Sequence, residues 1–121
     1  MSTRAVAFLA TREPERALRF YRDVIGLPLI EETAFAIVFD AFGTQLRVQI
    51  VESFARAPYT AFGLQVDDIA REVRALAAKG VSGVRYPHLP QDELGIWTAP
   101  TGARVFWFHE PDENLISLSQ G

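Results

Sequence analysis

The stretch RVFWFHEPDENLISLSQ, residues 104–120, predicts two β-strands joined by a tight turn. RVFWFH is an apolar, aromatic run, and LISLSQ alternates, so that Ile116 and Leu118 share one face and Ser117 lies on the other. EPDEN has the chemistry of a turn, because proline fixes its own φ angle and aspartate and asparagine suit turn positions. We therefore expect one face of the hairpin to pack against a core and the other face, which carries Ser117, to lie outside that core.

Outward from this hairpin, the chain shows one order of elements twice. In the first half, a strand, a helix and three strands are predicted over residues 4–10, 13–27, 27–32, 35–40 and 45–51. In the second half, a strand, a helix and further strands are predicted over residues 59–66, 68–80, 83–87, 95–100, 104–109 and 115–120, with a loop at 88–94. The repeated β-α-β-β-β order indicates duplication of one supersecondary unit.

Both predicted helices carry signals at their ends. Pro14 fits the first helical position of the first helix, and Gly26 fits its end. Asp67 or Asp68 can cap the second helix, and Gly80 can end it. Each half alone would be a small sheet with a helix on one face, so the halves must pack or pair to close a cavity.

The bulk composition excludes several classes of function. The chain has 121 residues, the size of one domain, and a net charge of −3, which argues against a nucleic-acid partner. It has no cysteine, so disulfides, thiolate metal sites and a cysteine nucleophile are excluded. It lacks an apolar run of membrane-spanning length and a signal-peptide cleavage pattern. We therefore expect one cytoplasmic domain over residues 1–121 with no membrane partner.

Three separated stretches, residues 16–29, 64–81 and 102–120, resemble the vicinal oxygen chelate superfamily. This group contains glyoxalase I, extradiol dioxygenases, fosfomycin resistance transferases and bleomycin resistance proteins. The resemblance implies an α+β fold of two βαβββ modules, over about 4–51 and 59–120, each a curved mixed sheet with one helix on its convex face. It also implies a ligand site on the concave side and a homodimer, in which exposed sheet edges become covered.

The resemblance implies four metal-ligand positions, which fall near Val6 on the first strand, at Arg47 late in the first module, near Ala61 on the fifth strand and at Ser117 on the last. Metal-dependent members carry His, Gln or Glu there, because a divalent cation needs converging nitrogen and oxygen donors. None of the four residues here is a good ligand, and the arginine would repel a cation. We therefore predict no metal and no cofactor, and the family's isomerase or dioxygenase mechanism is not carried over.

The hairpin turn departs from the family pattern as well. Glu113 stands where the family usually has glycine. If the turn needs a positive φ angle there, glutamate costs about 1 kcal/mol relative to glycine. Alternatively, the turn has changed type, with Asn114 in the left-handed region.

Strand parity predicts a mixed wall on the concave side, where polar groups orient a ligand and aromatic groups bury it. The candidate ligand-binding residues are Phe8, Arg47, Gln49, Gln65, Trp97 and Ser117. Arg47 could clamp a carboxylate or phosphate, or it could pair with a nearby glutamate or reach solvent. Trp97 and Trp107 could stack on a flat ligand or belong to the core.

No catalytic residue is assigned, although two histidines could act as acid or base groups. His88 lies in the loop at 88–94 and His109 lies beside the hairpin turn, so both are expected to be solvated. The loop itself is either a lid over the cavity or a solvated polar segment.

Three functions remain open at this point. The favoured one is a metal-free protein that binds a small organic molecule, as bleomycin resistance proteins do. The second is a metal-dependent or metal-independent lyase, isomerase or dioxygenase of the same superfamily, with converging groups among His88, Glu93, His109 and Glu52. The third is a structural or regulatory module whose cavity is filled by side chains such as Val6, Phe8 and Ala61.

Overall fold

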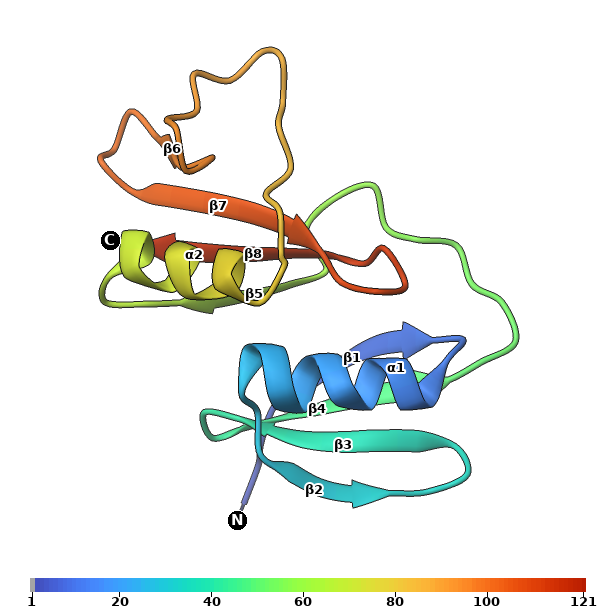
Figure 1. Cartoon of the computed structure of the whole chain (residues 1–121). Helices are drawn as coiled ribbons and strands as arrows, with labels where there is room; N and C mark the ends of the chain where they lie inside the picture. Colours follow the sequence, from blue (N-terminus) through green and yellow to red (C-terminus); the bar gives the residue numbers. More distant parts are fainter. Residues whose placement is uncertain (1) are drawn as a thin grey trace. The chain divides into compact units, whose positions relative to one another are not determined.

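A computed structural model describes residues 2–121 and divides the chain into two compact units (Figure 1). Unit 1 contains the residues up to Arg56 and also the hairpin turn Glu110–Asn114. Unit 2 contains Ala57–His109 and Leu115–Gly121. Within the described residues, no helix has the length and apolar character needed to cross a membrane.

Unit 1 is a four-stranded sheet with one helical segment. Its elements are β1 (Val6–Thr11), α1 (Pro14–Arg19), the π-helical turn η1 (Phe20–Ile25), β2 (Leu29–Glu32), β3 (Ala36–Ala41) and β4 (Thr44–Ile50). The strand order is β1-β4-β3-β2, in which β1 and β4 are parallel and the other pairs are antiparallel. The predicted helix is therefore present, but its second half is wound as a π-helix.

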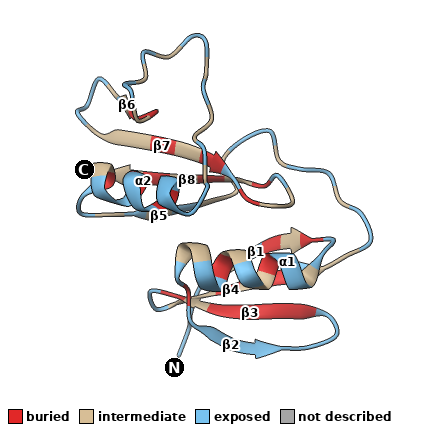
Figure 2. Ribbon diagram, viewed as in Figure 1, coloured by how far each residue is buried: buried red, intermediate tan, exposed pale blue. Residues whose placement is uncertain are grey.

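The helical segment of unit 1 covers one face of the sheet. It begins at Pro14 and ends at Gly26, whose φ of 89° is in the left-handed region that favours glycine. Tyr21 is fully buried, with its ring centroid 5.6 Å from that of Phe39. Phe39 is paired with Leu46, which is also buried. This face forms the core of unit 1, and Figure 2 shows β3 as its most buried strand.

Unit 2 repeats the arrangement. Its elements are β5 (Phe62–Gln65), α2 (Ile69–Ala78), β6 (Trp97–Thr98), β7 (Arg104–His109) and β8 (Leu115–Gln120). The strand order is β5-β8-β7-β6, with β5 and β8 parallel. The Asp68 carboxylate caps α2 by accepting a bond from the Arg71 amide at 3.2 Å. The predicted α+β fold of two βαβββ modules is confirmed.

One predicted strand of unit 2 is wrong, and another is much shorter than predicted. Residues 83–87 form no strand and contribute only an isolated bridge between Gly83 and Phe108. The strand expected over 95–100 is reduced to β6. Gly83 packs closely on the buried Phe106 ring, since a Cβ atom there would lie 2.4 Å from a ring carbon. This segment therefore packs against the sheet rather than extending it.

Side chains, rather than a strand ladder, satisfy the backbone of residues 84–96. The Gln91 side chain accepts from the Tyr86 amide at 2.7 Å and donates to the Val84 and Gly95 carbonyls at 2.9 Å. The Asp92 carboxylate accepts from two more amides of the same loop, each at 2.9 Å. Such local side-chain bonds compete with sheet pairing, which explains why the strand is lost. The side chains of Gln91 and Asp92 thus hold the backbone of this loop through five hydrogen bonds.

The hairpin turn keeps the backbone conformation that glycine would favour. Glu113 has a φ of 65°, whereas Asn114 is not in the left-handed region. The Glu113 amide donates to the Glu110 carbonyl at 2.7 Å. The alternative that the turn changed type, with Asn114 left-handed, is therefore wrong.

Candidate functional site

The face of the unit 1 sheet that lies opposite its helix carries three of the predicted ligand-binding residues. The register sets Phe8 beside Arg47 and sets Gln49 beside Ala10. Phe8 is 54% exposed although it is a large apolar residue, and Gln49 is exposed as well. Phe8, Arg47 and Gln49 thus form one continuous wall.

Arg47 is the charged group of this wall. It is half-buried, and one terminal nitrogen lies 3.4 Å from the Gln45 side-chain oxygen. Within the described part of the chain, no carboxylate pairs with its guanidinium. An arginine on a sheet face without a carboxylate partner can offer its planar donor fork to a ligand.

The corresponding face of the unit 2 sheet carries the other three predicted ligand-binding residues, which are Gln65, Trp97 and Ser117. Gly63 and Gln65 on β5 lie beside Ser117 and Ser119 on β8, and Trp107 lies on the other side of Ser117. Gly63 leaves room for this hydroxyl, because a Cβ atom there would lie 2.8 Å from the Ser117 oxygen. The face therefore offers hydroxyl and amide groups along β5 and β8.

An aromatic cluster completes the unit 2 face. The ring systems of Trp97 and Trp107 are stacked, with centroids 6.0 Å apart. Tyr86 meets Trp107 edge-on at 5.2 Å. Both tryptophans are residues that the sequence offers for stacking, whereas Tyr86 is a member of the cluster that it did not predict. Alternation along RVFWFH agrees with this placement of Trp107, because Phe106 and Phe108 are buried on the other face.

The four positions at which the resemblance implies metal ligands do not suit a metal. Val6, Arg47 and Ser117 lie on the sheet faces just described, and Ala61 directly precedes β5. Their donor set is an isopropyl group, a guanidinium, a methyl group and one hydroxyl, which cannot hold a divalent cation. Across residues 2–121, no three His, Asp or Glu side chains gather as a ligand set.

The histidines and the other candidate acid or base groups are not assembled into a centre. His88 is exposed, and its ring lies edge-on at 5.9 Å from Tyr86. His109 is exposed at the end of β7, opposite Leu115. Glu93 and Glu52 are exposed as well.

Unit 1 contains a buried carboxyl group, whose burial the sequence did not predict. Glu110 is only 2% exposed, and its two oxygens accept bonds from the Tyr21 hydroxyl and the Asn114 amide, both at 2.8 Å. Burial raises the pKa of Glu110, although these two bonds act in the opposite direction. Burial and the nearby Glu110 charge also raise the pKa of Tyr21. The Asn114 side chain donates to the Ala10 carbonyl at 3.0 Å. These bonds hold the hairpin turn in unit 1.

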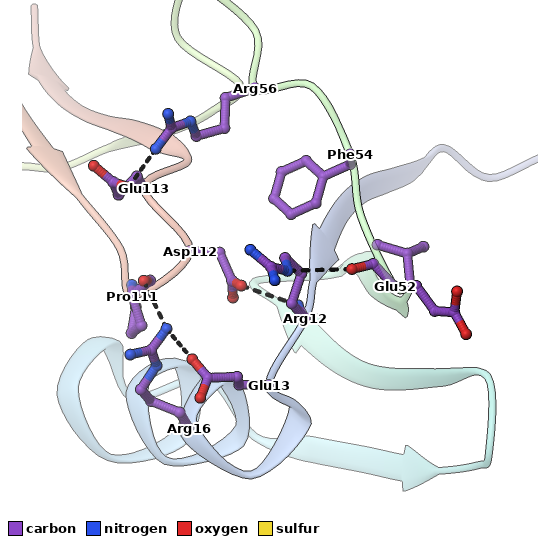
Figure 3. A pocket seen from close by; sticks show the side chains of 10 residues that line it. Arg12, Glu13, Arg16, Glu52, Phe54, Arg56, Pro111, Asp112 and Glu113 are labelled. Atoms are coloured by element: carbon purple, nitrogen blue, oxygen red, sulfur yellow. Dashed lines mark hydrogen bonds and ion pairs between the residues drawn. The ribbon is translucent and has the colours of Figure 1, made fainter.

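A groove in unit 1 is a second feature that the sequence did not predict (Figure 3). It has a volume of about 710 Å³. Its lining residues are Arg12, Glu13, Arg16, Val51, Glu52, Phe54, Arg56, Pro111, Asp112 and Glu113. None of the six predicted ligand-binding residues belongs to it.

Comparisons with known proteins agree with this fold. The family model of the Glyoxalase/Bleomycin resistance protein/Dioxygenase superfamily matches residues 4–118. No curated protein sequence matches the chain. The crystal structure of the genomically encoded fosfomycin resistance protein FosX from Listeria monocytogenes is similar with a TM-score of 0.78 and 15% identity, covering 100% of this chain and 94% of that one.

Two further solved structures show the same fold. A superfamily member from Sphaerobacter thermophilus is similar with a TM-score of 0.77 and 20% identity, covering 100% of this chain and 98% of that one. Lactoylglutathione lyase from Agrobacterium tumefaciens is similar with a TM-score of 0.73 and 18% identity, covering 100% and 95%. At these identities the likeness concerns the fold.

Proposed function

Because the chain belongs to the Glyoxalase/Bleomycin resistance protein/Dioxygenase superfamily, we propose that it binds a small organic molecule on its concave sheet faces, without a metal at the family position. The observation that carries this proposal is the position of Arg47. Arg47 is half-buried, is the cross-strand neighbour of the exposed Phe8, and has no carboxylate partner within the described residues. A structural arginine would normally be paired, so this one is suited to an acidic or carbonyl group of a ligand.

The aromatic groups favour a ligand with a flat body. Trp97 and Trp107 present stacked indoles, and Tyr86 supports Trp107 from its edge. Aromatic side chains bury large ligand areas and stack on planar groups. Gln65 and Ser117 on the unit 2 face, and Gln49 on the unit 1 face, would each orient polar groups of a ligand bound on the face of their own unit.

Fold alone does not choose between binding and catalysis, because a resistance protein and a lyase are both among the similar structures. The residues at the four implied metal-ligand positions favour binding over metal-dependent catalysis. With Val6, Ala61 and Ser117 at three of the four implied ligand positions, the metal chemistry of a glyoxalase or dioxygenase has no support here. The lyase, isomerase or dioxygenase alternative would need acid and base groups on one face, and within residues 2–121 no three His, Asp or Glu side chains gather as a ligand set.

We also propose that the protein is a cytoplasmic homodimer. Exposed apolar side chains support the dimer: Val6 and Phe8 on the edge strand β1 are 41% and 54% exposed. Edge strands and apolar faces of this kind are commonly covered by a second chain. Sedimentation velocity over a range of concentrations tests this point, and a monomer at all concentrations contradicts it.

The binding proposal is tested by titrating the protein with a panel of flat organic acids and amides, with ¹H–¹⁵N chemical shifts as the readout. Saturable shifts should appear at the amides of Phe8, Arg47 and Gln49 for at least one compound, and Arg47→Gln should weaken its binding there about tenfold. Arg19→Gln, an exposed arginine on α1, is the charge-matched control and should leave the affinity unchanged. Elemental analysis of protein incubated with divalent metals and desalted completes the test, because one metal per chain would contradict the metal-free proposal.

A further inference from the structure

The groove beside the hairpin turn lies wholly within unit 1 and is distinct from the concave face of that unit. Its walls come from the end of β1 and the start of α1, from the segment that follows β4, and from the turn itself (Figure 3). Its volume of about 710 Å³ falls within the usual range of small-molecule sites. Phe8, Arg47 and Gln49 do not line it.

Two of the three arginines in the groove are already engaged. Arg16 pairs with the Glu13 carboxylate and donates to the Pro111 carbonyl at 3.0 Å. Arg56 pairs with the Glu113 carboxylate. Their charges are therefore balanced inside the groove.

Arg12 is held in place but keeps its terminal nitrogens available. Its amide donates to Asp112 Oδ1 at 2.9 Å, and its Nε donates to the Glu52 carbonyl at 3.2 Å. Within the described residues, no hydrogen bond or ion pair engages its two terminal nitrogens. Figure 3 shows the guanidinium in the space between Asp112 and Phe54. The exposed side chain is thus anchored through Nε, while its two terminal nitrogens have no protein partner among residues 2–121.

Asp112 does not need this guanidinium as its partner. Its second oxygen accepts from the Thr11 hydroxyl at 2.6 Å, and its first is bound by the Arg12 amide. Both carboxylate oxygens are therefore satisfied by groups on the chain leading from β1 into α1. A ligand that binds the Arg12 guanidinium has no ion pair to break.

The rest of the lining restricts the class of ligand. The lining is mostly polar, but Phe54, Val51 and Pro111 supply apolar surface that can contact an apolar part of a ligand. The groove has three arginines against four acidic residues, so each negative charge on a ligand is repelled by the lining as a whole, and a dianion such as a phosphate is disfavoured more than a single charge. A monoanion therefore depends on direct contact with the terminal nitrogens of Arg12. A planar guanidinium edge matches a carboxylate with two parallel hydrogen bonds.

From these observations we propose a second binding site in this groove, for a small organic monocarboxylate with an apolar body. Arg12 holds the carboxylate through its terminal nitrogens, and Phe54 covers the apolar part. The site is independent of the concave faces, so it holds whether or not those faces bind a ligand.

Phenylacetate is a suitable probe, followed by ¹H–¹⁵N chemical shifts of the full chain. For a probe of this size we expect a dissociation constant on the order of 1 mM. Saturable shifts should centre on the amides of Arg12, Phe54 and Asp112. Arg12→Gln should weaken binding at least about tenfold, because it removes a charge-assisted pair. It leaves the main-chain bond to Asp112 intact, so the groove should remain folded.

Two controls separate this site from the concave face. Arg19→Gln should leave the phenylacetate affinity unchanged. Arg47→Gln should remove only those shifts that centre on Phe8 and Gln49, and it should leave the shifts at Arg12, Phe54 and Asp112 in place. Phenylphosphonate, a dianionic analogue, should bind more weakly than phenylacetate. The proposal is overturned if no saturable shift occurs, if phenylphosphonate binds more tightly, or if Arg47→Gln abolishes binding while Arg12→Gln does not. In the last case the probe occupies the concave face. That result would support the proposed function and would contradict a binding site in the groove.

Discussion

The hydroxyl of Tyr21 donates a 2.8 Å hydrogen bond to the carboxylate of Glu110, although 89 positions separate the two residues. Both side chains are buried, and the described structure pairs Glu110 with no cationic group. The bond ties the hairpin turn to the helical segment of unit 1. It also places a carboxyl group where water cannot stabilise its charge.

Replacing Glu110 with glutamine should change how stability depends on pH. The pKa of Glu110 is raised by burial, so its contribution to stability is fully present below the unfolded carboxyl pKa and is lost as pH rises through the higher folded pKa. We expect Glu110→Gln to be less stable than the parent at about pH 4 and to lose that disadvantage toward about pH 7. Urea unfolding across this range measures the difference. The exposed Glu15→Gln serves as the control, and a parallel shift in both variants would refute the assignment.

Removing the Tyr21 hydroxyl should destabilise unit 1. In Tyr21→Phe, Glu110 loses the donor to one buried oxygen, which costs about 1–3 kcal/mol near neutral pH. Chemical denaturation gives the value, with the exposed Tyr59→Phe as the matched variant expected to change stability very little. A cost as small as that of the control would show that water reaches Glu110.

Gln91 should be needed to keep Tyr86 in contact with Trp107 on the aromatic face of unit 2. Its side chain makes three bonds that hold residues 84–96, and that loop positions Tyr86 against Trp107. Gln91→Ala should cost about 1–3 kcal/mol and shift tryptophan emission toward that of solvated indole. Glu93→Ala, in the same loop, should have neither effect. Unchanged emission in Gln91→Ala would mean that packing alone fixes the tyrosine.

Phe42 should be a stabilising target. It has a φ of 55° and is 80% exposed, and Gly43 follows it with a φ of 95° in the turn between β3 and β4. Asparagine followed by glycine is favoured in such turns, so Phe42→Asn should raise stability by up to about 1 kcal/mol. Phe35→Asn is the control, because Phe35 is 81% exposed without a positive φ. Equal effects at both positions would assign the gain to lost apolar exposure.

Much of the fold could be predicted because its signals are local. Alternation in the β8 segment placed Ile116 and Leu118 on one face, which is buried, and Pro14 and Gly26 marked the ends of a helix. The segment at 83–87 was mistaken for a strand because its apolar residues suggested one. The backbone instead bonds to Gln91, a side chain several positions away, which a pattern of apolar residues does not reveal.

The sites were harder to predict because they depend on long-range pairing. Parity placed Phe8, Arg47 and Gln49 on one face, since strand alternation needs only the neighbouring residues. The groove depends on Arg12, Phe54 and Asp112, which come from three distant stretches. Glu110 read as an ordinary turn residue, because nothing in the sequence showed that Tyr21 would lie over it.

The turn Glu110–Asn114 belongs to unit 1, while the strands on either side of it belong to unit 2. The chain thus passes between the units after Arg56, before Glu110 and after Asn114. A fragment ending at Arg56 would lack the carboxyl group that binds Tyr21, and a fragment beginning at Ala57 would carry Glu110 without that tyrosine. Recombination that exchanges one half of the chain must therefore also supply a compatible turn.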